Sequence, residues 1–235
     1  MRWLVLPIFL VFAGCETAST NAPQQTAPVA QSKTKNISHA EATRRIASVK
    51  ARVEPVAERE CRQRTQLGTN CNFDISVDTR TELPPNAYQT VNKTGRPLIV
   101  FTTALIAQAG NTDELAFVMG HEAAHHVRGH LTRQQQDAFA GAALGAILVG
   151  LAGGNGEAID MAVNVGADIG ARSFSKNYEL EADALGTVIA HKAGYNPVRG
   201  AEFFNRIPDP GDQFLGTHPP NRARQKIVRE TAAKL

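Results

Sequence analysis

The feature that most constrains this chain is a pair of histidines, His121 and His125, with Glu122 directly after the first of them. Asn111 followed three residues later by Glu114 is a helix-start signature, so the pair is predicted to lie within a helix. Because an α-helix turns once in about 3.6 residues, both imidazoles leave the same face and can reach one metal ion. Histidine nitrogens bind zinc at about 2.0–2.1 Å. The stretch therefore predicts a zinc site, with Glu122 close enough to act on a metal-bound water.

A hydrolytic zinc site keeps three protein ligands and one open position, so the chain must supply a third ligand. Glu179 and Asp183 lie four residues apart on one face of a later predicted helix, whereas Glu181 points away from that face. One of the pair is expected to bind the metal. Asp183 suits the supporting position, because a ligating histidine usually donates its other N–H to a carboxylate. An acidic, solvated helix face is the alternative, and His126 and His130 are predicted to lie outside the ligand set.

Residues 37–235 predict an α+β domain that is mostly helical, with a small sheet beside the histidine-bearing helix. The first helix begins after Ser38 and is expected to kink or end at Pro55. Alternating apolar and polar residues predict short strands, and their short connections favour antiparallel pairing, at 73–78, 87–91 and 97–102.

Two segments bear on a membrane. Residues 1–14 have the basic start and short apolar run of a signal peptide, and they end in small residues before Cys15. This arrangement is similar to a bacterial lipobox, in which the cysteine is lipidated; a plain signal peptide or an uncleaved anchor is the alternative. An Asp directly after the lipidated cysteine resembles a signal for retention in the inner membrane. This chain has Glu16 at that position, which favours the outer membrane. The polar residues 15–36 predict a flexible tether. The apolar, Ala- and Gly-rich residues 138–153 predict a buried or hairpin helix, with membrane contact as the alternative.

Cysteine usage agrees with export. Once Cys15 is assigned to lipid, Cys61 and Cys71 remain as a pair, which predicts a disulfide in an oxidising compartment such as the periplasm. Two free thiols are the alternative. The net charge is only +3 and the basic residues are scattered, so no nucleic-acid partner is expected.

Together these motifs resemble the family of zinc metallopeptidases that includes the CAAX prenyl protease and the HtpX heat-shock protease, most closely its periplasmic members. The shared pattern is His-Glu-x-x-His, then Glu-x-x-x-Asp, then His-Pro, which this chain carries at 121–125, 179–183 and 218–219. The resemblance covers about residues 40–232 and implies a zincin-like fold, one zinc ion per chain and Glu179 as the third ligand. It also implies that His218 lies near the metal as a gate or oxyanion donor, and that Arg224 is a further site residue.

The expected function is that of a zinc endopeptidase of the bacterial cell envelope, in which Glu122 is the general base for the attacking water. The resemblance implies unfolded or misassembled envelope proteins as substrates, bound in extended form along an edge strand at Asn86, Ala87 and Tyr88. His218, which lies beside two prolines, is a candidate to fill the open zinc position and keep the enzyme inhibited. The rival hypothesis is an envelope chaperone or assembly lipoprotein with a structural or latent zinc site, in which Glu122 has no role.

Overall fold

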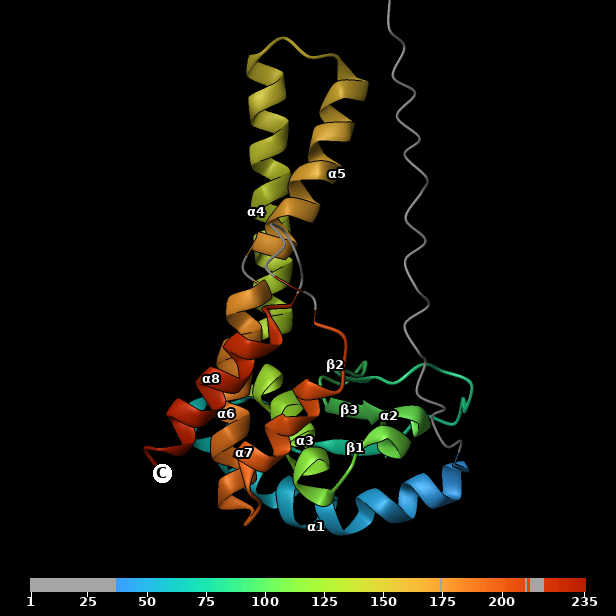
Figure 1. The fold of residues 1–235 in the computed structure, drawn as a ribbon. Helices are drawn as coiled ribbons and strands as arrows, with labels where there is room; N and C mark the ends of the chain where they lie inside the picture. Colours follow the sequence, from blue (N-terminus) through green and yellow to red (C-terminus); the bar gives the residue numbers. More distant parts are fainter. Residues whose placement is uncertain (1–36, 174, 210, 212–217) are drawn as a thin grey trace, which may run out of the picture. The chain divides into compact units, whose positions relative to one another are not determined.

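The computed structural model describes residues 37–173, 175–209, 211 and 218–235, so the predicted signal peptide, the lipidated Cys15 and the tether lie outside this part. The elements follow one another along the chain (Figure 1) as α1 (His39–Arg64), β1 (Asp74–Val77), β2 (Ala87–Val91), β3 (Pro97–Phe101), α2 (Thr103–Gln108), α3 (Thr112–Val127), α4 (His130–Leu151), α5 (Gly156–Ser173), α6 (Ser175–Lys192), α7 (Pro197–Gly200), the 3₁₀ helix η1 (Ala201–Asn205) and α8 (Asn221–Ala232). The prediction of a mostly helical α+β domain is confirmed.

The first helix is capped as its sequence predicts. The Ser38 hydroxyl accepts a hydrogen bond from the backbone N–H of Glu41, at 3.2 Å. α1 does not end at Pro55 but continues to Arg64. Val53 and Val56, on either side of the proline, are buried, and their packing offsets the backbone hydrogen bond that a proline cannot donate.

The sheet is mixed rather than wholly antiparallel. β1 runs parallel to β3, with Ile75 opposite Ile99, whereas β2 runs antiparallel to β3, with Tyr88 opposite Val100. The parallel pairing arises because residues 78–86 carry the chain from β1 past β3 to the far side of that strand. Among the described strands, β2 therefore lies at one edge of the sheet, with β3 on one side only.

The core forms around α3, which packs against α1, α6 and the sheet. Ile99 and Phe101 of β3 are wholly buried, as are Phe117 and Met119 of α3 to within 1% of their surface. A disulfide joins Cys61, in the last turns of α1, to Cys71 ahead of β1. The histidine-bearing helix is therefore held in the interior of the domain by packing on several sides.

α4 and α5 form an antiparallel hairpin with very close backbones (Figure 1). A Cβ on Gly141 would lie 2.0 Å from the carbonyl oxygen of Gly166, so only glycines allow this approach. Small residues face the partner helix, and the larger apolar side chains are exposed on the outside, Leu151 by 84%. The prediction of a hairpin helix is confirmed and that of a buried helix is wrong, while membrane contact of this segment stays a prediction. Each described helix is too short or too polar for a membrane crossing.

Candidate metal centre

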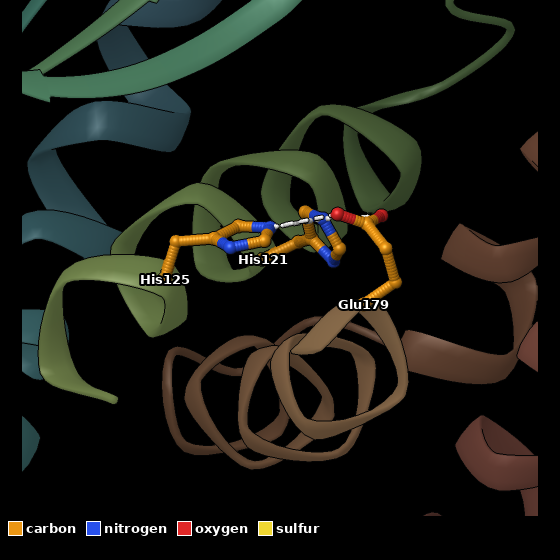
Figure 2. Close-up of side chains that lie close together, drawn as sticks. All are labelled: His121, His125 and Glu179. Atoms are coloured by element: carbon orange, nitrogen blue, oxygen red, sulfur yellow. Dashed lines mark hydrogen bonds and ion pairs between the residues drawn. The ribbon is translucent and has the colours of Figure 1, made fainter. Parts of the chain in front are cut away.

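Two helices bring the three candidate ligands together. α3 carries His121 and His125 one turn apart, and α6 carries Glu179 across from them (Figure 2). The two Nε2 atoms lie 3.0 Å apart, Nε2 of His125 lies 3.3 Å from Glu179 Oε1, and Nε2 of His121 lies 3.5 Å from Glu179 Oε2. The ligand-capable atoms therefore form a compact triangle between the helices.

The triangle fits a zinc ion. Ligand atoms that are 2.0–2.1 Å from one tetrahedral ion lie about 3.3 Å from one another, which is close to the separations between His121, His125 and Glu179. The donor set is also suitable, since two imidazoles and a carboxylate match the ligands of hydrolytic zinc sites. With three ligands from the protein, a fourth position remains for water or substrate.

Close helix packing makes this triangle possible. A Cβ on Gly186 would lie 2.8 Å from the backbone nitrogen of His121. A Cβ on Gly120 would lie 2.8 Å from the Gly186 carbonyl oxygen. Because neither glycine carries a side chain, α6 approaches α3 closely enough for Glu179 to reach the imidazoles.

Asp183 holds His121 from behind, as the sequence predicts for a supporting carboxylate. Nδ1 of His121 donates to Asp183 Oδ1 at 2.9 Å, so the Nε2 of a neutral ring has a free lone pair. Arg224 donates to both carboxylate oxygens of Asp183, from Nε and from Nη2, at 2.7 Å each. Burial raises the pKa of Asp183, but the Arg224 guanidinium outweighs it and holds this pKa below its usual value.

The electrostatics favour a positive charge between the ligands. Burial raises the pKa of Glu179, but contacts with His121, His125 and His218 hold it well below the usual value. Burial lowers the pKa of His121, yet Asp183 and Glu179 together raise it to about 10. The carboxylates of Glu179 and Asp183 therefore favour a positive charge among these atoms, and a divalent cation would benefit from them in the same way.

The site lies in a cleft of about 590 Å³. One wall is the β2 edge, with Asn86, Ala87 and Tyr88, and another is aromatic, with Phe203 and Phe204. The remaining site residues predicted from the sequence also line this cleft, namely His121, Glu122, His125, Glu179, His218 and Arg224. A metal centre of this composition, open to a cleft that an extended chain can enter, is an arrangement suited to peptide hydrolysis.

The amino-acid sequence matches peptidase family M48 over residues 43–232, which is most of the chain. This chain belongs to peptidase family M48. The zincin-type prediction is thereby confirmed at the level of the family, and M48 peptidases are zinc metallopeptidases. The finer likeness to the CAAX prenyl and HtpX proteases stays a prediction.

Three relatives illustrate the family. The beta-barrel assembly-enhancing protease of Escherichia coli (strain K12) is 29% identical over 150 residues, which are 58% of this chain and 31% of the relative. The putative beta-barrel assembly-enhancing protease of Vibrio cholerae is 30% identical over 148 residues, 57% of this chain and 30% of the relative. Mitochondrial metalloendopeptidase OMA1 of Arabidopsis thaliana is 27% identical over 136 residues, which are 56% of this chain and 27% of the relative. The peptidase thus spans about a third or less of each relative's length.

The candidate catalytic side chains of the peptidase are arranged around the ligand triangle. Glu122 is only 8% exposed, and it lines the cleft beside the candidate ligand His121. His218 is 55% exposed, and its Nδ1 lies 3.3 Å from Glu179 Oε2. Nη2 of Arg224 lies 3.3 Å from the same oxygen. The structure therefore brings all three residues together at the cleft, and their catalytic roles stay predictions.

A polar cluster behind His125 is what sequence reasoning missed. His130 is only 4% exposed, and its Nδ1 lies 2.9 Å from Nδ1 of His125. Burial, followed by the neighbouring His125, lowers the pKa of His130 to about 4. Glu181, which was expected to point away from the ligand face, lies 3.3 Å from Nε2 of His130. The only signal was Gly129, whose φ of 65° turns the chain so that α4 begins against α3.

Proposed function

We propose that this M48 peptidase is a zinc-dependent endopeptidase of the bacterial cell envelope, with one zinc ion per chain held by His121, His125 and Glu179. Unfolded or misassembled envelope proteins are its substrates. The observation that carries the proposal is the three-ligand triangle with Glu122 beside it, in a cleft bordered by β2, an edge strand among the described residues. A purely structural zinc site needs neither the open fourth position nor the adjacent carboxylate.

Zinc at this site supplies Lewis acidity, which activates water and polarises the scissile carbonyl. The Glu122 carboxylate accepts a proton from the attacking water and later delivers it to the leaving amide nitrogen. Asp183 and Arg224 keep His121 in one tautomer and one orientation. His218, half-exposed in the cleft, is the donor best placed to stabilise negative charge on the substrate oxygen, and Arg224 adds positive potential behind it.

The substrate binds as an added strand on β2. Ala87 and Tyr88 line the cleft, and among the described strands β2 pairs on one side only, with β3. Strand addition reads the substrate mainly through main-chain hydrogen bonds and therefore suits unfolded polypeptides of many sequences. The aromatic wall of Phe117, Phe203 and Phe204 favours an apolar side chain beside the scissile bond.

The envelope location rests on three observations. Relatives from Escherichia coli and Vibrio cholerae are named as beta-barrel assembly-enhancing proteases, and we take the cell envelope as the site of that activity. The Cys61–Cys71 disulfide suits an oxidising compartment. The N-terminal sequence resembles a lipoprotein signal ending at Cys15. These observations support a lipid-anchored peptidase of the periplasm, and Glu16 after Cys15 favours the outer over the inner membrane.

The second candidate function is an envelope chaperone or assembly lipoprotein whose zinc site is structural or latent. The contact of His218 with Glu179 favours it, because an imidazole so close to the ligand triangle can close the fourth position. In a latent enzyme, His218→Ala raises proteolysis. Unchanged or lower proteolysis of that variant in every assay contradicts the gating role.

The test compares zinc content and casein-type proteolysis of the wild type and Glu122→Gln. We expect the variant to keep its zinc and to lose proteolysis by about 10²–10⁴-fold, because a general base contributes on that order. Glu157→Gln, which removes the same charge from an exposed position on α5, is the matched control. If Glu122→Gln keeps both zinc and activity, the proposed mechanism is wrong. If both forms only suppress aggregation of an unfolded protein, the chaperone is favoured.

A further inference from the structure

We infer that His130 is a positioning residue, which, together with Glu181, holds the metal ligand His125 in the tautomer and orientation that zinc binding needs. The inference rests on the proposed zinc centre and extends it to residues outside the ligand triangle. Its basis is a chain of contacts that runs from Glu181 through His130 to His125, at 3.3 Å and then 2.9 Å.

The direction of each hydrogen bond follows from the groups at the two ends. An ionised carboxylate only accepts, so Nε2 of His130 carries the hydrogen and donates to Glu181 Oε2. Nδ1 of a neutral His130 is then an acceptor, and the hydrogen between the two rings must belong to Nδ1 of His125. Nε2 of His125 is left with a lone pair, which points toward His121 and Glu179. The relay therefore selects the one neutral tautomer of His125 that can bind the metal.

His130 is itself held in place from several sides. Its ring stacks on that of Tyr178, with centroids 4.8 Å apart and planes inclined by 17°. Arg133 donates to Glu181 Oε2 at 2.9 Å, and its guanidinium lies 4.2 Å from the centre of the Tyr178 ring. The Tyr178 hydroxyl donates to Asp137. These contacts leave the buried imidazole little freedom to turn away from His125.

The arrangement parallels the one behind the other histidine ligand. His121 donates directly to the Asp183 carboxylate, whereas His125 donates to a carboxylate through one intervening imidazole. Such outer partners fix ring orientation and raise ligand basicity, and their loss typically weakens metal binding 10–100-fold. The sequence reading, which excluded His130 as a ligand, is compatible with this role.

The experiment measures zinc affinity by competition with a chromophoric chelator, together with the visible spectrum of the cobalt(II)-loaded protein, in His130→Phe. Phenylalanine keeps the stacking on Tyr178 but has no nitrogen to accept from His125. We expect zinc affinity to fall 10–100-fold and the cobalt bands to shift, because a ligand ring is no longer oriented. His126→Phe is the matched control, since its Nε2 donates to the Asn70 carbonyl and it lies next to the same ligand in sequence.

Unchanged zinc affinity and an unchanged cobalt spectrum in folded His130→Phe overturn the inference. If that variant does not fold, Glu181→Ala takes its place, because Glu181 is 37% exposed and its loss frees His130 to change tautomer. We then expect a fall in zinc affinity of several-fold or more, and wild-type affinity refutes the positioning role. Zinc binding is measured without proteolysis, so failure of the proposed endopeptidase activity remains distinguishable from failure of this inference.

Discussion

The substitution Gly186→Ala tests how the metal centre is assembled. The new Cβ would lie 2.8 Å from the backbone nitrogen of His121 and 2.9 Å from its Cα, and ordinary contact begins at 3.4 Å. Backbone atoms inside a packed helix cannot rotate away, so α6 must move from α3 by about 0.6 Å, the difference between 3.4 and 2.8 Å. Glu179 and Asp183, both on α6, move with it.

Two consequences are expected. Overpacking of this kind lowers the free energy of unfolding by about 1–3 kcal/mol. Replacing glycine with alanine inside a helix raises it by roughly 1 kcal/mol. The free energy of unfolding of Gly186→Ala should therefore fall by up to about 2 kcal/mol. Metal–ligand distances tolerate only about ±0.2 Å. A shift of Glu179 by about 0.6 Å relative to His121 should therefore weaken zinc binding by at least about tenfold.

Urea unfolding and chelator competition measure the two quantities. Gly150→Ala is the matched control, because it makes the same change in α4 where a Cβ meets nothing within 4 Å. That control should keep wild-type zinc affinity and gain up to about 1 kcal/mol of stability. If Gly186→Ala behaves like Gly150→Ala in both assays, the close approach of α3 and α6 does not determine the geometry of the site.

Three further predictions concern stability. Burial raises the pKa of Glu60, but Lys192 and Arg64 outweigh it and lower this pKa. The pairing therefore contributes stability above about pH 4.3, the unfolded pKa, and loses it as the pH falls through the lowered folded value. Because Lys192 and Arg64 are half-exposed, Glu60→Gln should lower the free energy of unfolding by only about 1–2 kcal/mol at pH 7. Near pH 2 the substitution should have little effect. Equal effects at the two pH values would contradict the pairing. Reduction of the Cys61–Cys71 disulfide, which spans a sequence separation of 10, should cost about 2.7 kcal/mol in urea unfolding, and a double serine variant should match it. Removal of zinc by a chelator should lower the melting temperature, and restoring zinc should reverse the change, because the ion binds the folded state. A melting temperature that does not respond to the chelator argues against a bound metal.

Local patterns made part of the site predictable. The spacing of His121 and His125 determines that both leave one helix face, and the same holds for Glu179 and Asp183. The caps at Ser38 and Asn111 also depend only on neighbouring residues, and both helices begin there. Helix periodicity therefore gave the composition of each half of the site, because it acts within a few residues.

The features that were missed depend on contacts between distant segments. Parallel pairing of β1 with β3 follows from the crossover at residues 78–86, which short connections did not suggest. Residues 138–153 are apolar on all sides, so their sequence did not indicate which side would be exposed. In the structure the large side chains lie outside the hairpin and the small ones inside. His130 joins the cluster only because Gly129 turns the chain between two helices. Contacts between segments that are distant in the chain leave no periodic pattern in the sequence from which they could be predicted.

α6 carries more of the metal centre than its single ligand indicates. Glu179 belongs to the ligand triangle, Asp183 holds His121, and Glu181, on another face of the helix, holds His130 behind His125. A change that displaces α6 therefore disturbs one ligand and the supports of both others together. A change confined to the β2 edge alters only the wall where the substrate lies, so it should affect proteolysis without affecting zinc affinity. Zinc binding and substrate binding are thus separable by mutation, because the ligands and their supports lie on α3, α4 and α6, whereas the substrate pairs with β2.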